Sequence, residues 1–381
     1  MHVPVCEPLL DGNELKYVSD CIQSNWISSQ GQYIERFEQL FAGYHRLPHG
    51  IACTSCTTAL YMALLALEIG EGDEVIIPDF TLVVSANVVI QANARPVLVD
   101  VDPHTWCIDP AKIEQKITPR TRAIMAVHMY GHPCDMPAIL EIARRHNLFV
   151  IEDCAESVGA EIDGQLTGTF SHISCFSFYG NKIITTGEGG MCLTRDEHLA
   201  ARLRLLRDQG FQDPRFVHQV VGFNFRMTNM QAAIGLAQTE RIVEKVEKKV
   251  WIGQTYNKLL ANQAALTLPA DGGRVKNVYW MYGVLLEDSF GATKDQVMKT
   301  LAQQGIGTRS FFCPMHLQPV FLNAANPRYP DCGNPWQYPV SSRLWERGLY
   351  LPSGLGLTIE QMRDVASQLI ACQAGKGGLN E

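Results

Sequence analysis

Between residues 74 and 157 the sequence alternates short apolar runs with longer amphipathic ones, and this alternation restricts the possible folds more than any other feature. The short runs are rich in valine and isoleucine, as in strands buried on both faces: EVIIPD, RPVLVDVD, RAIMAVHMYG and FVIEDCAES. TLVVSANVVIQAN and DMPAILEIARRHN have helical spacing. Strands joined by helices predict an α/β fold, in which helices flank a mostly parallel sheet and ligands bind at the carboxyl ends of the strands.

The chain is long enough to form two domains. Its 381 residues exceed the size at which a single core usually stops growing. After the loop VGFNFRMTN the sequence continues as one long helical segment, which is a natural bridge into a second domain. We therefore predict a large domain at residues 1–245 and a smaller C-terminal α+β domain at residues 246–381.

Charge and apolar patterning exclude several classes of partner. The net charge of −7 argues against a surface for nucleic acid or anionic membranes. The N-terminus lacks the pattern of a signal peptide, and polar residues interrupt the most apolar run, FTLVVSANVVIQANARPVLV. We expect a cytoplasmic protein that binds neither nucleic acid nor membrane.

The twelve cysteines indicate buried reduced thiols rather than a disulfide framework, because they are scattered and mostly flanked by apolar residues. Cys53 and Cys56 form a C-x-x-C pair. No second pair and no nearby histidine cluster completes a zinc site, so we predict no metal.

One lysine lies in a loop suited to covalent chemistry. The stretch SFYGNKIITTGEGGM places Lys182 among glycines, hydroxyl groups and an amide, directly after a strand-like run. Glycines allow close approach of a ligand, and the polar groups can fix an anionic cofactor. By itself the stretch is equally compatible with a surface lysine in a glycine-shaped loop.

Two further features can complete a site around Lys182. A helix that begins near Ser55 can hold a phosphate with its free N–H groups, although an ordinary helix cap is the commoner use of such residues. Asp153 follows a buried strand and needs a cationic or hydrogen-bonding partner; capping of the next turn is the alternative. A Schiff-base lysine, a strand-end aspartate and a phosphate-binding helix start are the parts of a pyridoxal phosphate site.

The N-terminal region predicts two helices, at residues 11–24 and 33–45, around a polar loop. Trp26 and Ser28 in that loop could reach a site. Packing of the N-terminal segment over the main domain is the alternative.

Four long motifs resemble the DegT/DnrJ/EryC1/StrS sugar aminotransferases in the order of that family: FVIEDCAESVGA, FSFYGNKIITTGEGGM, VGFNFRMTNMQAAIG and RSFFCPMHLQP. The resemblance implies the aspartate-aminotransferase fold type I, pyridoxal 5'-phosphate as cofactor and a homodimer with shared active sites. It also implies transfer of an amino group from L-glutamate to a nucleotide-linked 4-keto-6-deoxy sugar. There are two alternatives. The enzyme could act on another keto sugar, such as an 8-keto octulosonate-type acid, or the chain could be a regulatory protein that binds cofactor or sugar nucleotide without turnover.

The resemblance also assigns roles to single residues. It implies Lys182 as the catalytic lysine, Asp153 on the pyridine nitrogen and Glu156 near the ring hydroxyl. It places Ser55, Cys56 and Ser177 at the cofactor phosphate, and it implies that Asn224 contacts the phosphate of the neighbouring subunit. It places His316 near the sugar and Arg226 at the interface site. The family often has an aromatic ring near position 82 to lie over the cofactor; this chain has Leu82 there, and Phe80 is the candidate replacement.

Overall fold

A computed structural model of the chain describes residues 2–214, 216–322 and 326–373. Its centre is a seven-stranded sheet with the order β1-β9-β8-β5-β4-β2-β3. Strand β9 is antiparallel to both of its neighbours, and the other pairs of adjacent strands are parallel, so the predicted mostly parallel sheet is confirmed. The strands are β1 (His49–Cys53), β2 (Glu74–Pro78), β3 (Arg95–Val99), β4 (Thr121–Val127), β5 (Phe149–Asp153), β8 (Ile173–Ser177) and β9 (Gly190–Thr194).

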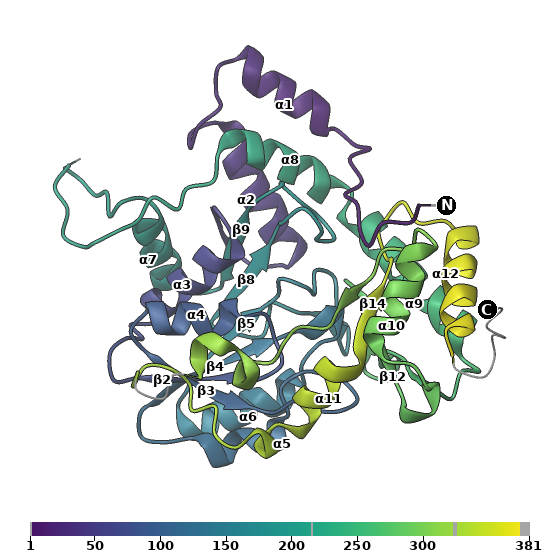
Figure 1. Cartoon of the computed structure of the whole chain (residues 1–381). Coiled ribbons are helices and arrows are strands. Elements are labelled where there is room, and N and C mark those ends of the chain that lie inside the picture. Colours follow the sequence, from purple (N-terminus) through teal and green to yellow (C-terminus); the bar gives the residue numbers. More distant parts are fainter. Residues whose placement is uncertain (1, 215, 323–325, 374–381) are drawn as a thin grey trace.

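Helices cover both faces of this sheet (Figure 1). One buried cluster joins the sheet to α2, α6 and α8, and a second joins it to α3, α4 and α7. Val150 belongs to the first cluster and Ile151 to the second, because successive side chains of a strand point to opposite faces. The helices are α2 (Gln32–Tyr44), α3 (Cys56–Ala66), α4 (Val84–Gln91), α5 (Pro110–Ile113), α6 (Met136–His146), α7 (Glu197–Arg207) and α8 (Asn229–Glu240).

A second, antiparallel sheet has the order β10-β12-β14-β13 and lies beside α9, α10 and α12 (Figure 1). Its buried cluster contains Tyr256, Tyr282 and Leu369. The elements are α9 (Ile242–Leu260), β10 (Leu266–Thr267), β12 (Tyr282–Leu286), α10 (Lys294–Gln303), β13 (Arg309–Ser310), α11 (Pro339–Arg347), β14 (Gly348–Leu351) and α12 (Ile359–Ala371). A small third sheet consists of β6 (Glu161–Ile162), β7 (Gln165–Leu166) and β11 (Val275–Lys276).

The predicted division at residue 245 stays a prediction, because segments from both sides of it pack with the other sheet. That position lies inside α9. Val3, near the N-terminus, belongs to the buried cluster of the second sheet, whereas Met315 and Phe321 pack into a cluster of the seven-stranded sheet. The N-terminal segment therefore contacts the smaller sheet, and the segment after β13 returns over the larger one.

Two helices replace the single long one expected after residue 228. Arg241 leaves the helical conformation, with φ −116°, between α8 and α9. Its guanidinium lies 2.7 Å from a carboxylate oxygen of Asp11 in the N-terminal segment. The first predicted N-terminal helix is α1 (Glu14–Gln23), and the second is α2. Within the described ranges, no helix combines the length and the apolar character needed to cross a membrane.

Candidate functional site

Six of the residues predicted for the cofactor site line one cavity of about 360 Å³ at the carboxyl ends of the parallel strands. They come from the start of α3, the end of β5, the end of β8 and the glycine-containing loop before β9. They are Ser55, Cys56, Asp153, Glu156, Ser177 and Lys182. The sheet thus brings together groups that are far apart in the sequence.

The start of α3 is built to receive an anion. Ser55 is the helix N-cap, and its hydroxyl oxygen accepts a hydrogen bond from the N–H of Thr58 at 3.2 Å. The N–H groups of Cys56 and Thr57 belong to the first turn, where no helical carbonyl is available to them. Together with the positive end of the helix dipole, they can hold a phosphate group.

Gly190 sets the distance between α3 and the sheet. It pairs with Cys53 in β1 and with Ser177 in β8, so it lies between two strands that end at the cavity. A Cβ atom at this position would lie 2.4 Å from the carbonyl carbon and oxygen of Ser55. Only glycine therefore lets β9 approach the first turn of α3 this closely.

Asp153 has one carboxylate oxygen tied and the other available. Oδ1 accepts a hydrogen bond from the N–H of Ala155 at 3.0 Å and one from the thiol of Cys56 at 3.8 Å. The side chain is buried, and burial raises the pKa of Asp153 above its ordinary value. A cation next to Oδ2 would offset that desolvation and stabilise the charged carboxylate.

Lys182 lies between a carboxylate and an aromatic ring. Its Nζ is 3.9 Å from Oε1 of Glu156 and 3.4 Å from the ring centroid of Trp280. Burial lowers the pKa of Lys182 and raises the pKa of Glu156 to about 7. A buried amine with a lowered pKa is a better nucleophile, because more of it is uncharged at neutral pH.

The backbone of Tyr130 holds Glu156 in place. Its N–H donates to Oε2 of Glu156 at 2.8 Å, which leaves Oε1 directed toward Lys182. Tyr130 has φ 51°, an unusual value for a bulky residue. Such local strain persists where the surrounding packing enforces it, here in an aromatic cluster with Phe311 and Phe312.

The donor set of this cavity fits pyridoxal phosphate. It combines an amine that can form a Schiff base, a strand-end carboxylate with a free oxygen, and a helix start beside the hydroxyl of Ser177. Among the described residues, Asn181 also lines the cavity with a buried side-chain oxygen, Oδ1, that has no hydrogen-bond partner. When bound, the cofactor supplies an electron-withdrawing ring that allows amino groups to be transferred.

Two of the other predicted residues are buried in the core and do not line this cavity. The side chain of Phe80 is buried and packs against Tyr130 and Phe311, at centroid distances of 6.1 and 5.8 Å, whereas Leu82 lines the cavity. His316 is also buried. Its Nδ1 lies 2.7 Å from Oδ2 of Asp79, and its other ring nitrogen lies near the hydroxyl of Ser342.

The remaining predicted residues gather in a second region. Arg226 donates to Ser29 at 3.1 Å and to Asp208 at 2.6 Å, and these three residues line a separate cavity of about 630 Å³. The carbonyl groups of Trp26 and Ser28 accept hydrogen bonds from Asn229, at 2.7 and 2.6 Å, and both residues are exposed. Asn224 is exposed too, and it forms an antiparallel bridge with Asp208 in the segment between α7 and α8.

Several residues that line the cofactor cavity were not predicted from the sequence. Thr57 is a neighbour of predicted residues, so closer attention to the same motif could have found it. Asn181 is the amide of the lysine loop, which the sequence already suggested as a group that can fix an anionic cofactor. Trp280, Phe312 and Tyr350 come from the region of the second sheet, and no local pattern distinguishes them from core residues. Their place in the cavity depends on how the two sheets pack.

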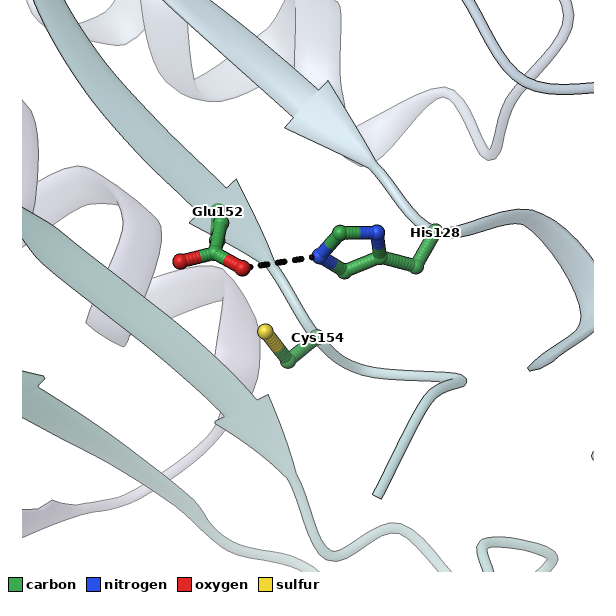
Figure 2. Close-up of side chains that lie close together, drawn as sticks. All are labelled: His128, Glu152 and Cys154. Carbon is green, nitrogen blue, oxygen red and sulfur yellow. Dashed lines mark hydrogen bonds and ion pairs between the residues drawn. The ribbon is translucent and has the colours of Figure 1, made fainter. Parts of the chain in front are cut away.

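Figure 2 shows a buried group of His128, Glu152 and Cys154 near the ends of β4 and β5 that has the composition of a metal site. The ligand atoms of His128 and Glu152 are already engaged. Nδ1 of His128 accepts the N–H of Cys134, so Nε2 carries the hydrogen and donates to Glu152 at 3.1 Å. Glu152 also accepts three backbone N–H groups, from residues 168, 170 and 171. We assign this group a structural role.

The fold and the cavity together define an enzyme that uses pyridoxal phosphate to transfer amino groups. Comparison with known proteins agrees: residues 8–370 match the DegT/DnrJ/EryC1/StrS aminotransferase family. The chain belongs to this family, as the sequence motifs predicted.

Similar proteins include two GDP-perosamine synthases. The one from Caulobacter vibrioides is 48% identical, over 93% of this chain and 94% of that protein. The one from Escherichia coli O157:H7 is 42% identical, over 95% of this chain and 96% of that protein. Among solved structures, DesV from S. venezuelae is 32% identical and has a TM-score of 0.87, with 95% of this chain and 94% of that chain covered.

Proposed function

We propose that the protein transfers the amino group of L-glutamate to a nucleotide-linked 4-keto-6-deoxy sugar. The observation that carries the chemistry is the shared cavity of Lys182, Asp153 and the start of α3. The substrate class is supported by the 48% and 42% identity to GDP-perosamine synthases over nearly the whole chain.

Each residue of the cavity has a distinct task in this proposal. Lys182 would hold the cofactor through its Nζ, and the same Nζ, when free, could take up and release a proton. Asp153 would face the ring nitrogen with its free oxygen and favour the protonated form of that nitrogen. Ser55, Ser177 and the first N–H groups of α3 would hold the phosphate, and Glu156 would contact the ring hydroxyl.

His316 contributes to the sugar site through its loop. Its ring is tied to Asp79, and the loop that it anchors carries Phe312, which lines the cavity. Loss of the imidazole would therefore shift Phe312 and weaken binding of the keto sugar. His316→Asn, which keeps a donor toward Asp79, is the milder variant, and His316→Ala the stronger one.

The functional unit in this proposal is a homodimer with shared sites. Asn224 and Arg226, with the loop that carries Trp26 and Ser28, would face the cofactor cavity of the partner subunit. Asn224 would add one directed hydrogen bond to the phosphate, worth roughly 1.5–3 kcal/mol. Exposed apolar side chains near these regions, such as Tyr179 at 50%, are consistent with burial in a dimer.

Mixing two inactive variants tests the shared site. A heterodimer of Lys182→Ala and Asn224→Asp subunits would hold one site with both lesions and one with neither, because a two-fold interface is reciprocal. We expect about half of the sites in each heterodimer to work. Absence of activity in proven heterodimers would show that both residues act within one chain.

The substrate is tested by product analysis. Purified protein is incubated with L-glutamate and a panel of keto sugars that contains nucleotide-linked 4-keto-6-deoxy sugars and an 8-keto octulosonate-type acid, and mass spectrometry identifies which sugar gains an amino group. Turnover of an octulosonate-type acid alone would redirect the substrate assignment. Binding without turnover of any sugar would indicate a regulatory protein.

Borohydride reduction tests Lys182 independently. It should fix the cofactor to Lys182 in the wild-type protein and leave no covalent cofactor in Lys182→Ala. Labelling of another lysine in that variant would refute the assignment.

We also propose a cytoplasmic location. All twelve cysteines are unpaired, which is typical of proteins that work in a reducing compartment. Fractionation of expressing cells checks this.

A further inference from the structure

Trp280 comes from the second part of the molecule but lies against the reactive lysine. It precedes β12 by two positions, and its side chain is buried. Lys182 Nζ lies 3.4 Å from the centroid of its indole ring. A protonated amine this close to the face of an indole is attracted by the negative charge density of the ring.

Trp280 is held by a hydrogen bond of its indole and by a second one to its backbone. The indole Nε1–H donates a hydrogen bond of 3.0 Å to the carbonyl oxygen of Asn181. Asn181 is the residue directly before Lys182. The carbonyl oxygen of Trp280 accepts a bond from Lys249 at 2.8 Å, and Lys249 also donates to Ser353 at 2.6 Å. Tyr130 stacks near the ring at a centroid distance of 6.2 Å.

These bonds also tie the ring to the loop of the lysine. The carbonyl group of Asn181 accepts a second, weaker bond from the thiol of Cys6, at 3.5 Å. The N-terminal segment, the lysine loop and the segment between β11 and β12 thus meet at one oxygen atom. Because the ring and the lysine share this anchor, their relative position is fixed by local contacts.

We propose that Trp280 is a positioning residue, whose indole face receives the amine of Lys182 whenever that lysine is not covalently bound to the cofactor. This inference rests on the proposed function, in which Lys182 is the cofactor lysine. A released lysine must stay close to the reacting atoms to move a proton, and a fixed ring face keeps it there.

The ring also acts on the charge of the amine. The titratable groups that face Lys182 are Glu156, Asp153, Cys56 and Cys6; these favour the ammonium form, whereas burial opposes it. The indole adds an attraction that does not itself titrate. It therefore keeps the pKa of Lys182 higher than an aliphatic wall of the same size would.

Fluorinated tryptophans placed at position 280 alone test this attraction. Fluorine withdraws electrons from the ring but hardly changes its shape, so a purely steric contact is left intact. The full chain is loaded with the amine form of the cofactor, in which Lys182 is free. The rate at which Lys182 reacts with an amine-directed reagent is then followed against pH by mass spectrometry.

We expect the pKa of Lys182 to fall stepwise as fluorines are added, by roughly half a unit to one unit in total. The control places the same residues at Trp251, whose ring faces Lys248 at 3.9 Å on a helix of the second part. Fluorinated tryptophans at position 251 should leave the pKa of Lys182 unchanged.

An unchanged pKa of Lys182 across the series at position 280 would overturn the proposal. Trp280→Leu gives a second measurement: it should lower kcat while the KM for L-glutamate stays near that of the wild type. A change in KM alone would also contradict a role in holding the lysine. The result is separate from the borohydride test, because a failed fluorine series leaves the identity of the cofactor lysine untouched.

Discussion

Replacing Gly190 with alanine tests how the phosphate-binding end of α3 is positioned. The new Cβ would lie 2.4 Å from the carbonyl carbon and oxygen of Ser55 and 2.7 Å from the nitrogen of Cys56. Ordinary contacts begin at 3.4 Å, so β9 and α3 must move apart by about 1 Å. The atoms in the way belong to the backbone, and no side-chain rotation can relieve the clash.

The expected losses follow from this displacement. Overpacking of this kind lowers the free energy of unfolding by roughly 1–3 kcal/mol. Moving the first turn of α3 also weakens at least one N–H bond to the phosphate, and a hydrogen bond to a charged group is worth roughly 1.5–3 kcal/mol. Cofactor affinity should therefore fall by roughly 10- to 100-fold.

Absorbance titration measures the dissociation constant of the cofactor, and thermal unfolding of the cofactor-free chain measures stability. Gly180→Ala, in the loop that precedes β9, is the matched control, because the nearest atom to its new Cβ is the carbonyl oxygen of Gly187 at 3.9 Å. It should retain the affinity of the wild type. Equal affinities for Gly190→Ala and Gly180→Ala would refute the argument that this contact positions the helix.

Three further variants test the cavity. Asp153→Asn should lower kcat by roughly 100- to 1000-fold in steady-state assays, because it removes a preorganised charge; near-normal turnover would contradict this. Cys56→Ala should lower kcat roughly 2- to 10-fold by removing one donor to Asp153, whereas Cys56→Ser keeps a donor and should lose less; equal losses would mean that the thiol only fills space. Burial raises the pKa of Glu156 to about 7, so the free energy of unfolding should fall as pH rises from about 4.5 to about 7. Thermal unfolding of cofactor-free Glu156→Gln should show a flatter dependence on pH; identical slopes would refute it.

Much of the fold could be predicted because strands and helices leave local patterns in the sequence. The runs that became β2, β4 and β5 are continuous in valine, isoleucine and alanine, which only a strand covered on both faces can bury. The helix start at Ser55 was recognisable because capping depends on residues within one turn. The position of Asp153 at a strand end followed from the same local pattern.

No local pattern in the sequence indicates that the helix breaks at Arg241 or that Met315 packs against the larger sheet. Arg241 ends a helix while bonded to Asp11, more than two hundred positions away, and local helix propensity carries no information about that partner. Met315 looks like any core residue. Which sheet it covers depends on the path of the whole C-terminal segment.

The sequence by itself determined the parallel sheet, the capped start of α3, the strand-end aspartate and the lysine loop, because each depends on residues that are close along the chain. Only the tertiary structure decided which aromatic rings reach the cavity. Phe80 points into the core although it neighbours the site in sequence, and Trp280 reaches Lys182 from far along the chain. The physical reason is that the direction of a side chain and its distant contacts are set by how the two sheets pack, which no short stretch of sequence encodes.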